Sequence, residues 1–378
     1  MAAEDVTMSA VLECDGVINP EDPDVGLRKI FKRIRPNWAA EKIEFKSLSK
    51  EGFVNTLLLA THDEDISNAV VIRIYSSSFD SFLDRKREVA ALKVFNERGL
   101  SPRTYCVFKN GVCMQYLQGR TWPWEELTAG EFSNVKIMRA AARELARYHS
   151  KKTSDIALGK YGEMFSWEVE MIAIQKKVMD HWPDHGYGDA KTDEIFKQYP
   201  SKECWQAAVN EIMVALRDNG APIAMCHLDA TPVNMFYMAE EDRVIFFDYE
   251  LSAFNFTPVD FARFLQFSAS GLDIDLSDER RHSDAVRSEF FRAYLEEQKL
   301  LGDFDRDITE KEVQRLSVLT DKAVLADYLF DSAMTIIIAQ TVVVNSTFSR
   351  KDLIEFAVKE YTWYKLHKER ILALEVPM

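Results

Sequence analysis

The sequence predicts an α+β protein of two lobes, a small lobe with a five-stranded antiparallel sheet and one helix, and a larger, mainly helical lobe. The prediction rests mainly on two patterns in the distribution of apolar residues. Apolar runs of strand character are concentrated before residue 118 and are separated by short polar turns. After Gly119, apolar residues recur instead with helical spacing. A chain of 378 residues is also too long for one small core.

The small lobe is expected to span residues 23–118, after an acidic flexible tail over residues 1–22. A first helix ends before Pro36, because the residue before proline disfavours helical geometry. Gly99 is placed to end the second helix, and Lys109-Asn110-Gly111 is a tight-turn signal between the last two strands. The expected helices and strands are, in chain order, 25–34, 43–48, 55–61, 69–75, 81–98, 104–108 and 112–117.

The larger lobe is expected to span residues 119–378. Ser133 is placed to cap its first helix, and Thr309 with Glu312 has the spacing of a capping box before the last of four clear helices. These helices are expected over residues 135–149, 204–219, 284–297 and 310–321. Residues 333–344 contain strand-favouring runs, but we interpret them as a buried helix that is too short and too polar to span a bilayer.

Composition excludes several classes of protein. The formal net charge of −14 argues against nucleic acid as a partner and against stable attachment to an anionic membrane. Five scattered cysteines without a CxxC pair are typical of reduced thiols, and the acidic N-terminus has no secretory signal. We therefore expect a soluble, cytoplasmic protein without membrane insertion. A homodimer stays open as an alternative to a monomer.

The strongest functional signal is the string CHLDATPVNMF followed by VIFFDYELSAFNFTPVDFARFL. Asp229 precedes Asn234 by five residues, and Asp248 follows fourteen residues later, after an expected strand over residues 244–247. Asp229 is interpreted as a general base, or as the group that orients an acceptor hydroxyl. Asn234 and Asp248 offer the oxygen ligands that Mg²⁺ prefers. Together, in this order, the three residues predict a phosphotransferase that uses ATP and Mg²⁺.

Three residues near Asp229, Asn234 and Asp248 can each be interpreted in two ways. His227 either braces the loop by hydrogen bonding or transfers protons, and we favour the brace. Glu250 joins a second metal site or is an ordinary loop carboxylate. Asp260 anchors the catalytic loop from behind or simply caps the next helix.

Arg73 stands in the middle of the strand VVIRIY, where an isolated cation needs a partner. Glu88, on the following helix, is expected to pair with it and to direct it at nucleotide phosphates. Arginine would add bidentate phosphate recognition at this position. A buried ion pair without a nucleotide role is the alternative.

Two further segments are expected to contact the nucleotide. The turn that contains Gly52 and Asn55 would cover the phosphates, although a single glycine makes it a weak motif. Gln115 and Leu117 would offer backbone groups to adenine, and an ordinary buried strand is compatible with that role.

Together these strings resemble the choline/ethanolamine kinase family, and within it the ethanolamine kinases. CHLDATPVN resembles the family's His-Asn-Asp-x4-Asn loop, FFDYELSAFNFTPVDFA resembles its metal-binding segment, and EGFVN resembles its nucleotide loop. The similarity covers about residues 26–376 and is weakest over 150–205. It implies a protein-kinase-like fold and transfer of the ATP γ-phosphate to the hydroxyl of ethanolamine or choline, the first step of phospholipid head-group synthesis.

The acceptor pocket departs from this family. The tryptophans of its His-Phe-x-Trp-Gly-x-Trp helix, which hold the acceptor's ammonium by cation–π attraction, are absent from the aligned stretch Tyr328-Leu-Phe-Asp331-Ser-Ala-Met334. Leu228 also replaces the usual asparagine. A primary ammonium donates hydrogen bonds and favours a carboxylate. We therefore hypothesise that Asp331 binds ethanolamine, flanked by Tyr328 or Tyr249; the alternative is that Asp331 lies on a helix surface and the acceptor differs.

Other functions remain open at this point. The chain could phosphorylate choline, another amino-alcohol or an aminoglycoside, or it could be a nucleotide-binding pseudokinase with a regulatory role. The intact triad speaks against a pseudokinase. A protein kinase is disfavoured because no Asp-Phe-Gly with an activation segment and Ala-Pro-Glu occurs.

Overall fold

The computed structural model describes residues 11–48, 55–76, 83–123, 127, 130–166, 171–270, 276–277, 281–341 and 349–377. The chain divides into two compact units. The first comprises Met1–Gly119 together with Ile245–Glu250, and the second comprises Arg120–Val244 and Leu251–Met378. Residues 245–250 therefore belong to the first unit, although the residues on both sides of them belong to the second.

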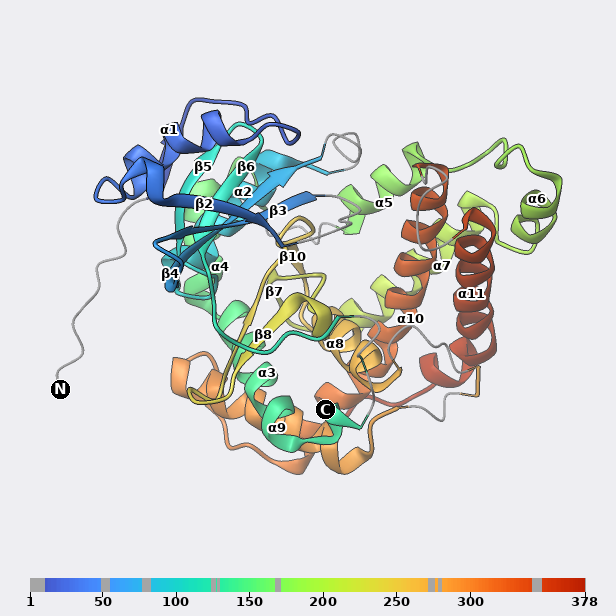
Figure 1. Cartoon of the computed structure of the whole chain (residues 1–378). Coiled ribbons are helices and arrows are strands. Elements are labelled where there is room, and N and C mark those ends of the chain that lie inside the picture. The colour runs from blue at the N-terminus through green and yellow to red at the C-terminus, as the bar shows by residue number, and fades with distance from the viewer. Residues whose placement is uncertain are drawn as a thin grey trace. The chain divides into compact units, whose positions relative to one another are not determined.

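A six-stranded sheet forms the centre of the first unit (Figure 1), in the order β1-β5-β6-β4-β3-β2. Five of its strands pair antiparallel, as predicted: β2 (Ile43–Ser47), β3 (Asn55–His62), β4 (Asp65–Tyr75), β5 (Thr104–Phe108) and β6 (Gly111–Gln115). The sixth strand, β1 (Leu12–Cys14), pairs parallel with β5. The expectation of a flexible tail is therefore wrong for these three residues, where Cys14 is buried against the sheet.

Two helices accompany this sheet. In α1 (Asp24–Ile34), Leu27, Ile30 and Phe31 are buried, and they share a hydrophobic core with strand residues of the sheet. In α2 (Arg85–Glu97), the side chain of Asp84 accepts hydrogen bonds from the first backbone N–H groups. The helix thus begins later than the predicted residue 81, because the aspartate is the cap.

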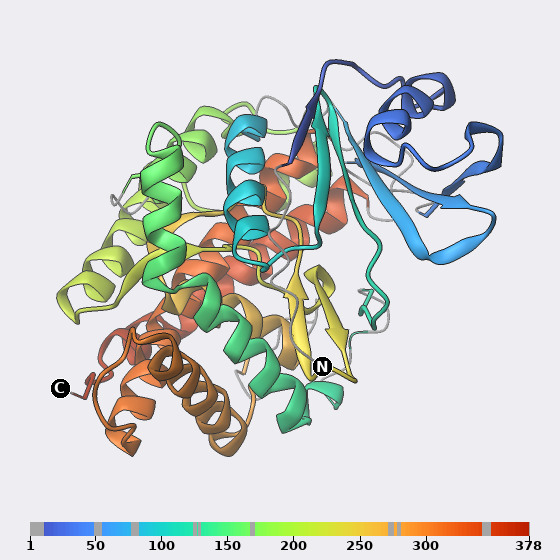
Figure 2. The same ribbon diagram turned by 90° about the vertical axis from the view of Figure 1, so that its left-hand side faces the viewer.

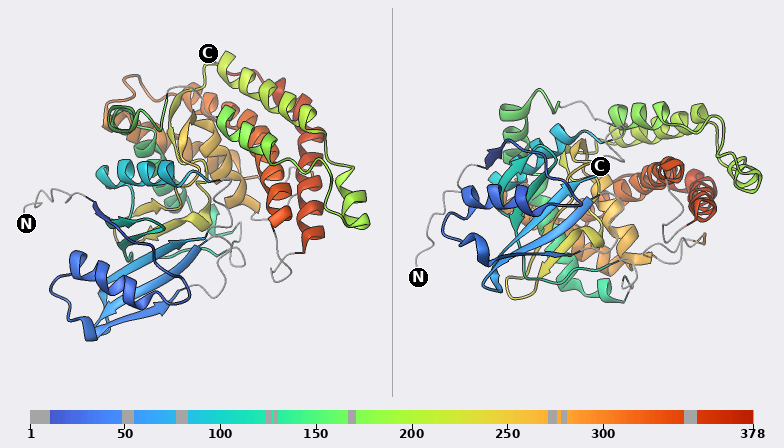
Figure 3. Two further views of the ribbon diagram at one scale, coloured as in Figure 1. Left: turned by 90° about the horizontal axis from the view of Figure 1, so that it is seen from above. Right: turned by 45° about the horizontal axis from the view of Figure 1, so that its top comes forward.

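The second unit is mainly helical. Its helices are α3 (Val135–Tyr148), α4 (Lys151–Tyr161), α5 (Met171–Asp180), α6 (Ala190–Phe196), α7 (Lys202–Asp218), α8 (Pro258–Ser270), α9 (Asp284–Leu301), α10 (Glu310–Thr341) and α11 (Arg350–Leu372). Figure 2 shows α3 beside α9, and Figure 3 shows α10 beside α11. Two short strand pairs are also present. β7 (Ile223–Cys226) pairs antiparallel with β10 (Ala253–Phe256). β8 (Met235–Met238) pairs with β9 (Arg243–Phe246), and the boundary between the units falls inside β9.

Two further differences concern the cap of α3 and the continuity of the last predicted helix. Asn134, and not Ser133, caps α3, because the asparagine side chain accepts a hydrogen bond from Lys136 N. The predicted helices over 310–321 and 333–344 are one continuous helix, α10, as far as Thr341, and residues 342–344 lie outside the described residues.

Burial explains the continuity of α10, because Ile336 and Ile337 lie in the core and tertiary packing overrides their strand propensity. Over Glu310–Gln340 this helix is long and apolar enough to cross a membrane by length and composition alone. However, 67% of its most apolar window is buried inside the protein, as in a core helix.

Candidate active site

The loop between β7 and β8 is fixed from behind by a buried carboxylate. Asp260, inside the first turn of α8, accepts hydrogen bonds from the backbone N–H of His227 at 2.8 Å and of Leu228 at 2.7 Å. The ring of His149 contacts the same carboxylate at 2.9 Å. Burial alone would raise the pKa of Asp260, but the hydrogen bonds and charges of His149 and His227 outweigh it, so this pKa is lowered. Asp260 thus contacts the loop and is not a simple N-cap.

His227 is fully buried behind the loop. Its ring Nδ1 accepts a hydrogen bond from the backbone N–H of Asp229 at 3.2 Å, and its ring packs against Tyr148. These contacts are consistent with a side chain that braces the loop. That His227 transfers no proton stays a prediction. Leu228 has a positive φ of 64°, a left-handed conformation that asparagine adopts more readily than leucine.

Asp229 and Asn234 face each other across the loop. The short 3-10 helix η5 (Pro232–Asn234) turns the chain so that Asn234 Nδ2 donates to Asp229 Oδ2 at 2.6 Å and to the Asp229 carbonyl at 3.1 Å. Arg263, one turn into α8 from Asp260, donates to Asp229 Oδ1 from Nη2 at 3.1 Å and from Nε at 3.2 Å. The candidate base is therefore held by an amide on one oxygen and a guanidinium on the other.

Arg263 is the residue of this site that the sequence reasoning missed. Its Nη1 also donates to Asp331 at 2.9 Å and contacts Asp327 at 3.5 Å, so it binds carboxylates from α10 as well as from the loop. Glu360 of α11 is fully buried close to Asp331. We call Arg263 and these four carboxyl groups (Asp229, Asp327, Asp331 and Glu360) the Arg263 cluster.

Burial and mutual repulsion favour protons within the Arg263 cluster. The pKa of Asp327 is raised to about 7, first by burial and then by Asp331 and Asp229, although Arg263 opposes the shift. The pKa of Glu360 is raised well above its usual value by burial and by Asp331. In the part of the chain that the structure describes, Asp327 Oδ2 accepts no hydrogen bond. The cluster therefore has more acidic groups than its guanidinium can satisfy, and it would be stabilised by a further cation.

The residues predicted to flank the acceptor are found in different places. Asp331 is only 15% exposed and is ion-paired, so the alternative of a helix-surface residue is wrong. Tyr328, one turn earlier in α10, is buried and stacks on Trp363 with 4.0 Å between ring centroids. Tyr249 belongs to the first unit, where its hydroxyl donates to the Phe246 carbonyl, and its predicted role at the acceptor stays a prediction.

In the first unit, Arg73 binds three carboxylates. It contacts Glu88 of α2 at 3.2 Å, Asp248 at 2.9 Å and Glu250 at 3.1 Å. Arg85 contacts Glu88 at 2.8 Å and Glu250 at 3.4 Å. The predicted partner of Arg73, Glu88, is thus in place, and the segment after β9 supplies the other two acids.

The three carboxylates of the first unit suit a divalent cation. One oxygen each from Glu88, Asp248 and Glu250 lies within 4.8 Å of the others. The pKa of Glu250 is raised to about 8, first by burial and then by the charge of Asp248, despite the opposing arginine Arg73. Three carboxylates face two arginines here, so one negative charge is left to be balanced. Clustered carboxylate oxygens of this kind are suitable ligands for a hard cation such as Mg²⁺. Asp248 has a φ of 70°, which aspartate tolerates better than most residues.

The remaining nucleotide-site predictions are untested. Gln115 ends β6 and its backbone N–H donates to the Arg103 carbonyl at 2.8 Å; Leu117 follows the strand, and Asn55 begins β3. Gly52 lies outside the described residues. The joint binding of one metal ion by Asn234 and Asp248 also stays a prediction, because these residues belong to different units.

Comparisons with known proteins agree with the fold that the sequence predicts. The model of the choline/ethanolamine kinase family matches residues 47–366. Ethanolamine kinase 1 of Mus musculus is 26% identical over 364 residues, which cover 93% of this chain and 91% of that protein. Ethanolamine kinase 2 of Mus musculus is 26% identical over 373 residues, which cover 97% and 88%.

Solved structures share the fold of this chain. An ethanolamine kinase of Plasmodium vivax superposes with a TM-score of 0.71 at 17% identity, over 97% of this chain and 94% of that one. A choline kinase of Cryptosporidium parvum superposes with a TM-score of 0.67 at 16% identity, over 92% and 95%. At these identities the likeness establishes the fold.

Proposed function

This chain belongs to the choline/ethanolamine kinase family, and we propose that it transfers the γ-phosphate of ATP to the hydroxyl of ethanolamine. Family membership makes it a kinase-type phosphotransferase that acts on an alcohol group. The choice of ethanolamine rests on one observation, the excess of carboxyl groups in the Arg263 cluster. The similarity to ethanolamine kinases from Mus musculus supports the same choice.

The chemistry of the cluster favours a primary ammonium over a quaternary one. A primary ammonium donates three hydrogen bonds, and charge-assisted bonds to carboxylates are the strong ones. The quaternary nitrogen of choline donates none and is best held by aromatic faces. Asp331 stands where the family has a tryptophan, and its carboxylate is the proposed direct contact with the ammonium. Arg263 keeps the surrounding acids in place.

Asp229 is the proposed catalytic base. It would accept the hydrogen bond of the acceptor hydroxyl and orient that oxygen towards the phosphate. Phosphoryl transfer depends mainly on positioning and charge neutralisation. The hydrogen bonds from Asn234 and Arg263 would contribute by fixing the direction of the Asp229 carboxylate. His227 and Asp260 act as positioning residues behind this loop.

The nucleotide is proposed to bind with Mg²⁺. Asp248 and Glu250 from the first unit would hold the metal, with Asn234 supplying a further oxygen. A bound Mg²⁺ neutralises charge on the phosphate oxygens. Arg73, braced by Glu88, would contact the phosphates directly, and Gln115 and the turn around Asn55 would hold adenine and the phosphates.

We also propose a cytoplasmic location and a small-molecule partner. All five cysteines are free thiols, in keeping with a reducing compartment. The net charge of −14 favours a cationic acceptor and disfavours nucleic acid.

A panel of acceptors tests the proposed function. Turnover of ATP is measured with ethanolamine, choline, other small amino-alcohols and an aminoglycoside, each with Mg²⁺. We expect the highest kcat/KM with ethanolamine. A higher kcat/KM with choline would refute the proposed acceptor, and nucleotide binding without turnover of any acceptor would indicate a pseudokinase.

A further inference from the structure

Arg263 places a fixed positive charge inside the proposed acceptor site. Its side chain is 8% exposed, so the guanidinium is almost completely enclosed. Nε and Nη2 donate to Asp229, and Nη1 donates to Asp331. One arginine therefore bridges the proposed base and the carboxylate that is proposed to bind the acceptor's ammonium.

The same guanidinium lies over an aromatic ring. Its central carbon Cζ is 4.5 Å from the ring centroid of Phe267, which follows one turn later in α8 and is 2% exposed. A cation over the face of an aromatic ring is attracted by the ring's quadrupole, and quaternary ammonium ligands are recognised by the same attraction. Arg263 thus already occupies a ring face that a quaternary ammonium at this place would need.

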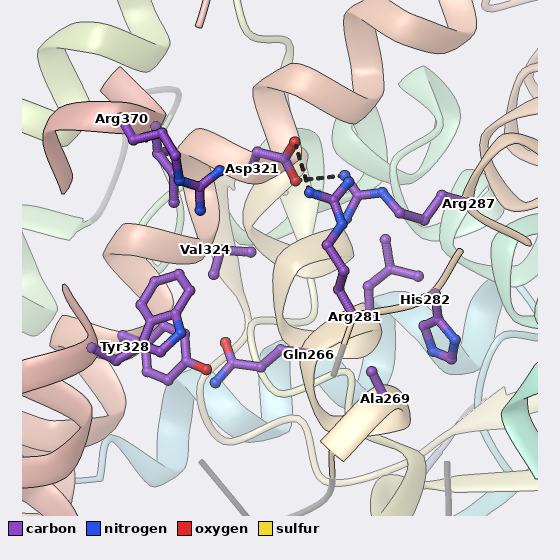
Figure 4. Close-up of a pocket in the computed structure, with 12 residues that line it drawn as sticks. Gln266, Ala269, Arg281, His282, Arg287, Asp321, Val324, Tyr328 and Arg370 are labelled. Atoms are coloured by element: carbon purple, nitrogen blue, oxygen red, sulfur yellow. Dashed lines mark hydrogen bonds and ion pairs between the residues drawn. The ribbon is translucent and has the colours of Figure 1, made fainter. Parts of the chain in front are cut away.

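The aromatic pair of Tyr328 in α10 and Trp363 in α11 is engaged as well. The centroids of these two rings are 4.0 Å apart in a stacked arrangement, and the ring of His367 lies 4.5 Å from Trp363. Both aromatic residues line a cavity between α8, α10 and α11 (Figure 4), and the described lining of this cavity includes no member of the Arg263 cluster. The faces that these two rings turn to each other are closed to a quaternary ammonium.

The carboxylates around Arg263 favour a ligand that donates hydrogen bonds. The side chains of Asp229 and Asp331 are 23% and 15% exposed, so each is partly accessible. Asp327 is buried, and within the described parts of the chain its Oδ2 accepts no hydrogen bond. A primary ammonium can donate to such oxygens, whereas the methyl groups of choline cannot and would leave them unpaired.

We propose that Arg263 is a specificity-determining residue that restricts the acceptor to primary amines. It covers the ring face of Phe267 and fixes Asp229 and Asp331 as hydrogen-bond acceptors, so that an ammonium has to bind by donating N–H groups to carboxylates. This inference rests on the proposed function, because it concerns the choice between amines at the same site.

The experiment compares ethanolamine with choline in variants of the full-length protein, by steady-state kinetics at saturating ATP and Mg²⁺. Arg263→Met removes the charge and uncovers the ring of Phe267. The ratio of kcat/KM for choline to kcat/KM for ethanolamine should therefore rise at least about tenfold over the wild type. A merely structural role would lower both values together and leave this ratio unchanged.

Arg263→Lys is the conservative variant. It keeps a cation beside Phe267, so the ratio should stay within about twofold of the wild type. Turnover of both amines should fall, because an ammonium lacks the planar fork with which arginine bridges Asp229 and Asp331. A rise of the ratio in Arg263→Lys as large as in Arg263→Met would overturn the proposal.

Arg139→Met is the matched control. Arg139 of α3 also bridges two carboxylates, those of Glu289 and Glu296 of α9, but it has no contact with the Arg263 cluster among the described ion pairs. This variant should leave both kcat/KM values unchanged. The same rise of the ratio in Arg139→Met would overturn the proposal.

Thermal melting shows whether Arg263→Met folds, since its buried carboxylates lose their counter-charge. If it does not fold, the double variant Arg263→Met with Asp327→Asn replaces it, because the second change removes one of these carboxylates. An unchanged ratio in the folded variant, with a wild type that phosphorylates ethanolamine, would overturn this inference alone. A wild type that prefers choline would overturn the proposed function as well.

Discussion

At the scale of single residues, Arg263 is the centre of the ion pairs around the proposed acceptor site. One side chain of α8 links the candidate base Asp229 to Asp331 and Asp327 of α10. A buried guanidinium in such a place is stable only among carboxylates, and carboxylates so close together need its charge. Arg263 and its acidic partners are therefore energetically coupled, because removal of either would leave buried charge uncompensated.

Asp331→Asn tests the proposed ammonium contact. The amide keeps the shape of the side chain but removes its charge, so the KM for ethanolamine should rise about tenfold or more while kcat changes little. Turnover of choline, which has no N–H to donate, should be nearly unaffected. Steady-state kinetics with both amines measures the effect, and Asp307→Asn, at an exposed position, is the control. An equal change for both amines would contradict a hydrogen-bonded contact.

Asp327 links stability to pH. Its pKa is about 7 in the folded protein, whereas an unfolded aspartate titrates near its ordinary value of 3.8. Between pH 4 and 7 the folded state thus binds more protons than the unfolded state, so this residue makes the protein less stable as pH rises.

Asp327→Asn should therefore stabilise the protein more at pH 8 than at pH 5, by a difference on the order of a few kcal/mol. Urea unfolding at the two values of pH measures it. A stabilisation that does not depend on pH would show that Asp327 is not the titrating group.

At the scale of elements, α8 connects the loop to the helical unit. The carboxylate of Asp260 in its first turn satisfies two buried backbone N–H groups of the loop. Asp260→Asn replaces one oxygen by a donor and leaves one of these N–H groups unpaired, which costs about 1–3 kcal/mol.

We expect Asp260→Asn to lower kcat and the unfolding free energy together, with little change in the KM for ATP. Kinetics combined with urea unfolding tests this expectation. A loss of stability with unchanged kcat would show that the loop keeps its catalytic geometry without this anchor.

The sequence predicted most elements because their signals are local. Alternating apolar residues and tight turns placed the five antiparallel strands, and the bounds of β5 agree with the prediction. β1 was missed because a three-residue parallel edge strand has no turn that signals its partner. The two parts of α10 were predicted separately because the strand propensity of Ile336 and Ile337 conflicts with their burial in one long helix.

The site was predicted only as far as its local spacing reached. Asp229 and Asn234 lie on one loop, so their spacing was visible in the sequence, although the hydrogen bond between their side chains was not predicted. The Arg263 cluster joins residues from one loop and three helices, and Arg263 is 64 positions from Asp327, so no local pattern reveals it. The available signal was the occurrence of charged residues, Arg263, Asp327 and Glu360, on otherwise apolar helix faces.

At the scale of the whole molecule, the proposed machinery is divided between two units. Asp229 and Asn234 belong to the second unit, whereas Asp248, Glu250 and Arg73 belong to the first. Residues 245–250, which include Asp248 and Glu250, belong to the first unit, whereas the residues on both sides of them belong to the second. Acceptor chemistry and nucleotide binding should therefore be separable by mutation.

Asp229→Asn and Asp248→Asn test that separation. Asp229→Asn removes the group that orients the acceptor hydroxyl, so turnover should fall at least about a hundredfold, the lower range for general base catalysis, while Mg-nucleotide binding persists. Asp248→Asn removes a charge from the proposed metal site and should weaken binding of an Mg-bound ATP analogue as well as turnover. Calorimetry with the analogue and a coupled assay for ADP measure the two effects on the same preparations.

Nucleotide binding by the two variants distinguishes the roles of Asp229 and Asp248. If Asp229→Asn also lost the nucleotide, the aspartate would act on the metal site and not on the acceptor. If Asp248→Asn bound the Mg-bound ATP analogue as tightly as the wild type does, Asp248 would not hold the metal. The carboxylates beside Arg73 would then form a structural ion-pair network, and Arg73 and Arg85 would account for phosphate binding. Selective loss in each variant would support separate roles for Asp229 in turnover and for Asp248 in binding of the Mg-nucleotide.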